Sequence, residues 1–152
     1  MSKNKFLRDK NRNYLRWLLL GFAIFYPMLT SIYIFLPPLI GVVGLFIIYN
    51  MERNKTYAFI GILYLLNLDF NATLPILLSL VIVILVYILI YPSAKLIINC
   101  KKCLAIFLII FINLLYYASL FLYDFIFSLN ILVANSTLIF YIIIDLMIGL
   151  LL

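Results

Sequence analysis

Long apolar stretches alternate with short basic clusters along this chain of 152 residues. The three clusters are residues 3–16, the pair Arg53 and Lys55, and the group Lys95, Lys101 and Lys102. A membrane-spanning helix takes about 20 apolar residues. Each of the two stretches between clusters, 17–52 and 56–94, is therefore long enough for two spans. Because a chain that crosses twice returns to its starting side, all three clusters are expected on one side, and basic residues mark the cytoplasmic side.

The pattern predicts an all-α fold, a polytopic membrane helix bundle with six transmembrane spans and both termini in the cytoplasm. A basic cytoplasmic segment, residues 1–16, would precede a single transmembrane domain, residues 17–152. The spans are expected at about 17–35, 39–50, 56–68, 74–91, 104–123 and 137–152.

Prolines mark several of the expected boundaries. Pro27 is expected to kink the first span or to mark the point where it leaves the lipid. The Pro37-Pro38 pair should force the outer turn before a short second span, which either starts at these prolines or lies in a locally thinned bilayer. Pro92 is expected to end the fourth span.

Three further segments have a predicted place. Residues 94–103 should form a short interfacial helix on the cytoplasmic face, since three lysines surround an apolar core. Residues 125–133 are expected at the outer interface or dipping into the bilayer. The Gly41-x-x-Gly44 step should allow the second span to approach another helix closely.

Composition agrees with a membrane protein. Hydrophobic residues make up 68% of the chain and charged residues 11%, unlike a soluble globular domain. The formal net charge of +6 could suggest nucleic acid. The basic residues flank apolar spans, however, so we expect no nucleic acid partner and assign them to topology and anionic lipid headgroups. The residues in this role are Arg16, Arg53, Lys55, Lys95, Lys101 and Lys102. The abundance of Ile, Leu, Phe, Tyr, Asn and Lys resembles a low-GC bacterial proteome, and we expect the protein in a bacterial inner membrane.

Asp145 is the sharpest candidate for function, because a carboxylate in the middle of the sixth span costs several kcal/mol unless it is paired, protonated or hydrated. It is either an ion, proton or substrate site, or a packing residue hydrogen-bonded to Asn113 or Tyr116 on the fifth span. No basic residue lies at its depth, which favours packing or partner contact over transport.

No catalytic constellation is recognisable. The chain contains no histidine, the commonest general base and metal ligand. Cys100 and Cys103 form a C-x-x-C step, but zinc needs four ligands and the chain has no other cysteine. We therefore expect no enzyme activity, no metal and no cofactor.

The connection between the third and fourth spans is expected to be a polar outer turn, with Asn67, Asp69 and Thr73 as its polar residues. The layout of the chain resembles MreD, the small polytopic subunit of the bacterial rod-shape machinery. A proline precedes the second span, in Leu36-Pro37-Pro38-Leu39, and a short basic turn, Glu52 to Lys55, leads into the third. In the region from Gly61 to Pro75, Asn67 or Asp69 takes the acidic place of the family and Thr73-Leu74 its Thr-Leu place. Each of the last two spans contains a polar residue, Asn113 and Asp145.

The resemblance implies a non-enzymatic scaffold that would sit beside an MreC-like subunit and, through it, MreB and the peptidoglycan synthases. The fold of that family is related to the substrate-binding subunits of vitamin-uptake transporters, which keeps a transporter or small-molecule-binding subunit as an alternative. An accessory subunit of another envelope machine, such as a flagellar motor, is a further alternative.

Overall fold

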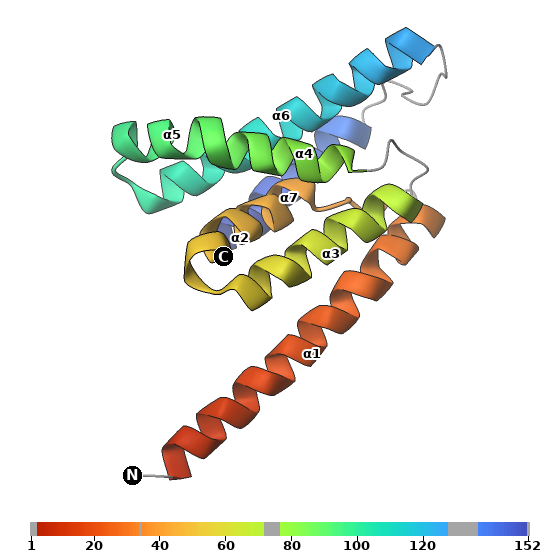
Figure 1. The fold of residues 1–152 in the computed structure, drawn as a ribbon. Helices are drawn as coiled ribbons and strands as arrows, with labels where there is room; N and C mark the ends of the chain where they lie inside the picture. Colours follow the sequence, from red (N-terminus) through yellow and green to blue (C-terminus); the bar gives the residue numbers. More distant parts are fainter. Residues whose placement is uncertain (1–2, 34, 72–76, 128–136, 152) are drawn as a thin grey trace.

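The computed structural model describes residues 3–33, 35–71, 77–127 and 137–151, and these residues form helices and short connections without any strand (Figure 1). The helices are α1 (Lys3–Ile32), α2 (Ile40–Arg53), α3 (Lys55–Asn71), α4 (Leu78–Leu85), the π-helical turn η1 (Val86–Ile90), α5 (Tyr91–Ile97), α6 (Lys101–Phe127) and α7 (Thr137–Leu151). The expected all-helical fold class is confirmed for this part of the chain.

Three helical stretches are long and apolar enough to cross a membrane. They are Tyr14–Ile32, Leu78–Ile97 and Lys101–Phe127, and Ile139–Leu151 is a shorter apolar helix. Large apolar side chains cover the exterior, among them Trp17, Phe25 and Phe125, which are 76%, 68% and 79% exposed. An apolar exterior on helices of this length is typical of a protein that lies in a bilayer.

Two pairs of consecutive helices are antiparallel. Pro38 and Phe46 meet Tyr64 and Tyr57 of α3, so α2 opposes α3. Asn113 and Ile109 of α6 meet Asp145 and Gly149, so α6 opposes α7. Arg16 lies over Tyr57 and Asn67 bonds to the carbonyls of Ala23 and Ile24, so α1 and α3 are parallel. Gly41 faces Asn113 while Leu45 shares a cavity with Leu104, so α2 and α6 are antiparallel. In Figure 1, α1 lies outside α3, on the opposite edge of the bundle from α4 and α5.

The core forms where α2, α3, α4 and α6 meet. Its fully buried side chains include Ile40, Ile48, Leu65, Leu108 and Ile112. α2 lies at the centre of this arrangement, against α3, α4, α6 and α7. It is only 14 residues long, about 21 Å at 1.5 Å per residue.

Glycines allow the close packing of α2. A methyl group at Gly44 would come within 2.9 Å of Ile112 and 3.0 Å of Val83, and one at Gly61 on α3 would come within 2.5 Å of Ile47. These distances are shorter than van der Waals contact, so larger side chains would push the helices apart. The close approach expected from Gly41 and Gly44 is confirmed.

The prediction of a polar outer turn at Asn67 and Asp69 was wrong. Both residues lie inside α3, which continues to Asn71, and Asp69 is fully buried. Leu68, next to Asp69, is buried as well, so the end of α3 has an apolar face that packs inside the protein. Thr73, the third residue of the expected turn, lies outside the described residues.

Pro92 does not end the fourth helical stretch, contrary to expectation. It occupies the first turn of α5, directly after the π-helical turn, in which the Tyr91 N–H donates to the Val86 carbonyl. A π-bulge widens the helix by one residue, so the ring of Pro92 is accommodated without a break. Residues 78–97 therefore form one stretch.

Two other expectations about segments need correction. No separate interfacial helix occupies 94–103, because α5 ends at Ile97 and α6 begins at Lys101 after a connection of three residues. Residues 125–127 extend α6, and the remainder of 125–133 lies outside the described residues. Pro27 is buried within α1, and the helix continues past it to Ile32.

Candidate functional site

The entry into α2 is built from a turn that cannot cap the helix by itself. The helix begins after Pro37-Pro38-Leu39, and Leu39 adopts a left-handed conformation with φ 51° and ψ 32°. Its side chain has no polar atom, and the first turn of α2 contains no acidic residue. The first N–H groups of the helix therefore need acceptors from elsewhere.

Two tyrosines bind the carbonyls of this turn. The Tyr26 hydroxyl on α1 donates to the Pro37 carbonyl at 2.9 Å, and the Tyr64 hydroxyl on α3 donates to the Pro38 carbonyl at 2.8 Å. Tyr64 is 2% exposed, and its ring stacks near those of Phe22 and Tyr26. The turn is therefore held in place by α1 and α3 together.

Asp145, from the middle of α7, supplies the missing cap. Its Oδ2 accepts the Gly41 N–H at 2.8 Å and its Oδ1 accepts the Val42 N–H at 3.3 Å. The same Oδ2 accepts a hydrogen bond from Asn113 Nδ2 on α6 at 2.7 Å. Because Asp145 is only 2% exposed, these contacts replace water as its partners.

This arrangement joins three helices at one carboxyl group. The start of a helix carries a partial positive charge and unpaired N–H groups, so an acidic side chain is stabilised there. The expected hydrogen bond between Asp145 and Asn113 is confirmed. The two backbone contacts were not predicted, and they give Asp145 the geometry of a structural cap.

Gly41 allows this carboxyl group to reach the backbone. A methyl group on Gly41 would lie 2.6 Å from Asp145 Oδ2 and would also collide with Asn113 Nδ2. Only a residue without a side chain leaves room for the carboxyl group and the amide together.

Asp69 and Ser79 form a second site of the same kind. α4 also follows a leucine in the left-handed conformation, Leu77 with φ 74°, and has no side-chain cap of its own. Asp69 Oδ2 accepts the Ser79 N–H at 3.2 Å and the Ser79 hydroxyl at 2.8 Å. Among the residues that the structure describes, none is hydrogen-bonded to the buried Asp69 Oδ1. A carboxyl group from α3 thus caps the start of α4.

Asn67 connects α3 to α1. Its side-chain amide donates to the carbonyls of Ala23 and Ile24, at 3.2 and 2.8 Å, and its oxygen accepts from Asn71 at 2.7 Å. Tyr116, the other candidate for contact with Asp145, is buried on α6 and meets the ring of Tyr117 edge-on.

The basic residues beyond α1 lie at the exposed surface. Arg16, on α1, packs against the Tyr57 ring with 5.7 Å between the guanidinium carbon and the ring centroid. The basic residues beyond α1, all of them exposed, are Arg53, Lys55, Lys95, Lys101 and Lys102.

The two cysteines are exposed free thiols at the start of α6. Cys100 Sγ accepts the Cys103 N–H at 3.3 Å, so this thiol is the cap of α6. Hydrogen bonds from the Cys103 side chain and backbone, with Lys102 nearby, lower the pKa of the Cys100 thiol. Among the residues that the structure describes, no group of three or more His, Cys, Asp and Glu side chains is placed to hold a metal ion.

Sequence reasoning found Asp145 and Asn113 but missed Tyr26, Tyr64 and Ser79. A signal was available in the sequence. Helix α2 starts at a Pro-Pro-Leu step without Ser, Thr, Asp or Asn, so its first N–H groups had to find an acceptor outside the helix.

The comparisons with known proteins add no relative. No family model matches the chain, and neither the curated proteins nor the solved structures contain a match to it.

Replacing Asp145 separates the role of a cap from that of a charge. Asp145→Asn keeps an oxygen for the Gly41 N–H and the Asn113 amide and loses the long, 3.3 Å bond from the Val42 N–H, so we expect a melting temperature a few degrees below that of the parent. Asp145→Leu leaves the Gly41 and Val42 N–H groups without this acceptor and removes one of the two bonds of Asn113 Nδ2, which keeps the Ile109 carbonyl. At about 1–3 kcal/mol for each lost acceptor, we expect a loss of about 3 kcal/mol or more of unfolding free energy. Thermal melting of purified protein in mild detergent measures both.

The control for this comparison is Met147→Leu, at an exposed position on the same helix. We expect it to melt with the parent. If Asp145→Leu also melted with the parent, the cap would have no energetic role.

Ser79→Ala tests the second cap. The change removes the hydroxyl that Asp69 accepts at 2.8 Å and leaves that buried carboxyl group with a single backbone donor. We expect a destabilisation of about 1–3 kcal/mol. Ser93→Ala is the matched control, because Ser93 is exposed and its hydroxyl makes only a long, 3.4 Å bond to the Leu89 carbonyl. Equal melting temperatures for the two variants would contradict the assignment.

Proposed function

We propose that the chain is a multi-pass protein of the bacterial inner membrane, with six spans and both termini in the cytoplasm. The alternating helix directions support this topology, since each helix hairpin returns the chain to its starting side. The basic side chains of the α2–α3 turn and of the α5–α6 connection then share the cytoplasmic side with the N-terminus.

Cysteine labelling tests this topology. Cys100 and Cys103 are exposed in the proposed cytoplasmic connection, so an impermeant maleimide should label them in inverted vesicles and not in intact spheroplasts. In a Cys100→Ser/Cys103→Ser background, Tyr33→Cys just beyond α1 should give the opposite pattern. Lys55→Cys is the matched cytoplasmic position. Labelling of Tyr33→Cys and Lys55→Cys from the same side would reject the topology.

We further propose that the protein is a non-enzymatic scaffold or assembly subunit of an envelope complex. The observation that carries this proposal is an apolar stripe along α1. Its members are spaced four and three residues apart, as in a helix–helix seam, and are all exposed: Leu18, Phe22, Phe25, Leu29 and Ile32. The opposite face of α1 packs on α3 through Ala23 and Asn67. Phe22 lies at the edge of the stripe and also stacks near Tyr64, whereas the other four members are available to a helix of another protein.

The internal polar residues favour a scaffold over a transporter. Asp145 accepts three hydrogen bonds from the protein, and Asp69 accepts two from Ser79. A residue that caps a buried helix start has a structural role at that position. Proton-coupled transport would require its carboxyl group to leave these donors in each cycle.

The elongation machinery is the complex we propose, on the resemblance of the chain to MreD. An MreC-like subunit and the peptidoglycan synthases would be its protein partners. A flagellar or secretion complex would use the same exposed stripe.

Affinity purification from the native host in gentle detergent tests the scaffold. We expect an MreC-like protein or a wall synthase to co-purify with the tagged parent. Leu18→Ala/Phe25→Ala removes two side chains of the stripe and should lower recovery about tenfold or more, since truncating central interface residues costs about 1–2 kcal/mol or more.

The matched control is Ile84→Ala/Ile88→Ala, which truncates two exposed apolar side chains on α4 and η1. It should leave recovery unchanged. An equal loss in both double variants would reject the stripe as the interface. Recovery of an ATPase pair with a coupling subunit would reject the scaffold in favour of transport.

A further inference from the structure

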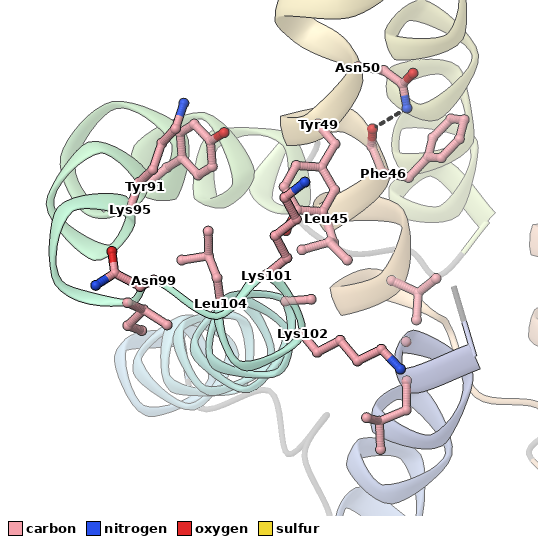
Figure 2. Close-up of a pocket in the computed structure, with 15 residues that line it drawn as sticks. Leu45, Phe46, Tyr49, Asn50, Tyr91, Lys95, Asn99, Lys101, Lys102 and Leu104 are labelled. Atoms are coloured by element: carbon pink, nitrogen blue, oxygen red, sulfur yellow. Dashed lines mark hydrogen bonds between the residues drawn. The ribbon is translucent and has the colours of Figure 1, made fainter.

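A cavity of about 620 Å³ opens at the end of the bundle that carries the α5–α6 connection. Figure 2 shows its 15 lining residues, which come from α2, α5, the connection after α5, α6 and α7. The volume is typical of a ligand site, for which about 300–1,000 Å³ is usual. Most of the wall is apolar, including Leu45, Phe46, Leu104 and Leu150.

Three lysines contribute to the wall of this cavity, and the ammonium group of Lys95 lies over the Tyr91 ring, 5.5 Å from its centroid. Lys95, Lys101 and Lys102 belong to its lining, and no acidic side chain among the described residues does. In Figure 2, Lys101 reaches from the start of α6 toward Tyr49 on α2, whereas Lys102 extends toward α7. The cavity therefore has positive charge at its mouth and hydrocarbon along its walls.

The start of α6 adds to this positive potential. Helix starts favour negative charge, yet the first turn of α6 contains no acidic residue and begins with Lys101 and Lys102. Its cap is the Cys100 thiol, and sulfur is a weak acceptor. An anion at this position would meet the helix start, with Lys101 on its α2 side and Lys102 on its α7 side.

We propose that this cavity binds the phosphate headgroup of an anionic phospholipid. The lysines and the start of α6 bind the phosphate, and the first part of an acyl chain lies along Leu45 and Leu104. An apolar wall would contribute nothing to a free phosphate, which is why a lipid fits better than a soluble anion. Basic pockets between helices on the cytoplasmic side are known to bind such headgroups.

The proposal uses the membrane setting of the proposed function and is independent of the partner complex. Its test is a titration of the purified protein in neutral detergent, with thermal melting as the readout. The probes are phosphatidylglycerol, phosphatidylcholine and inorganic phosphate. We expect phosphatidylglycerol to raise the melting temperature in a saturable manner, and phosphatidylcholine to have little effect.

The Lys101→Gln/Lys102→Gln variant should bind phosphatidylglycerol about 30-fold more weakly. This factor corresponds to about 2 kcal/mol, or about 1 kcal/mol for each of the two lysines. Arg53→Gln/Lys55→Gln is the matched control: it also removes two positive charges, at exposed positions outside the cavity. It should bind as the parent does. An equal loss in both variants would mean diffuse surface attraction and would overturn the site.

Ala105→Phe keeps all three lysines and fills part of the cavity. It should weaken phosphatidylglycerol binding while the protein still folds, as its melting temperature without lipid will show. If inorganic phosphate stabilised the parent as strongly as the lipid did, the ligand would be a free phosphate and the lipid proposal would fail. These results do not depend on which proteins co-purify, so failure of the lipid site and of the scaffold are distinguishable.

Discussion

The unpaired N–H groups at the buried start of α2 are the constraint on which the rest of the bundle depends. α2 is central and, at about 21 Å, shorter than the roughly 30 Å hydrocarbon core. It therefore begins within the protein, where water is excluded and each unpaired N–H group costs several kcal/mol. Asp145 supplies the acceptor, Asn113 orients it, and Gly41 leaves the space, so three helices are fixed relative to one another by one carboxyl group.

The same physical problem occurs at α4 and has the same solution. Both helices follow a leucine with positive φ, and both starts are capped by an aspartate from another helix. Asp69 differs in that one of its oxygens has no hydrogen-bond partner in the part of the chain that the structure describes. Because both buried acids bind backbone N–H groups, the internal polar residues of this protein serve assembly of the bundle. The binding of partners and lipid that we propose therefore uses other parts of the molecule, the exposed stripe of α1 and the basic cavity.

Hydropathy and charge predicted the helices and their order well, because lipid imposes the same requirement on every span: apolar side chains outside and basic residues at one end. The contact between Asp145 and Asn113 was also predictable, since two polar residues inside an apolar bundle are stabilised by a hydrogen bond to each other. The caps of α2 and α4 were not predictable. Capping rules concern neighbours in sequence, whereas Asp145 is separated from Gly41 by 104 residues. The prediction that a helix ends at Pro92 was wrong because the hydrophobic pattern does not reveal the π-helical turn that precedes this proline.

The short second span had two readings from sequence: a start at the prolines or a thinned bilayer. The structure favours the first, since Pro37 and Pro38 are bound by Tyr26 and Tyr64 and the helix starts directly after them. A short central helix beside the longer α6 needs no thinning of the lipid, because the N–H groups at its buried start are bound by protein. The length of α2 thus determines the depth at which an acid is needed, and this explains why a carboxyl group lies in the middle of an otherwise apolar α7.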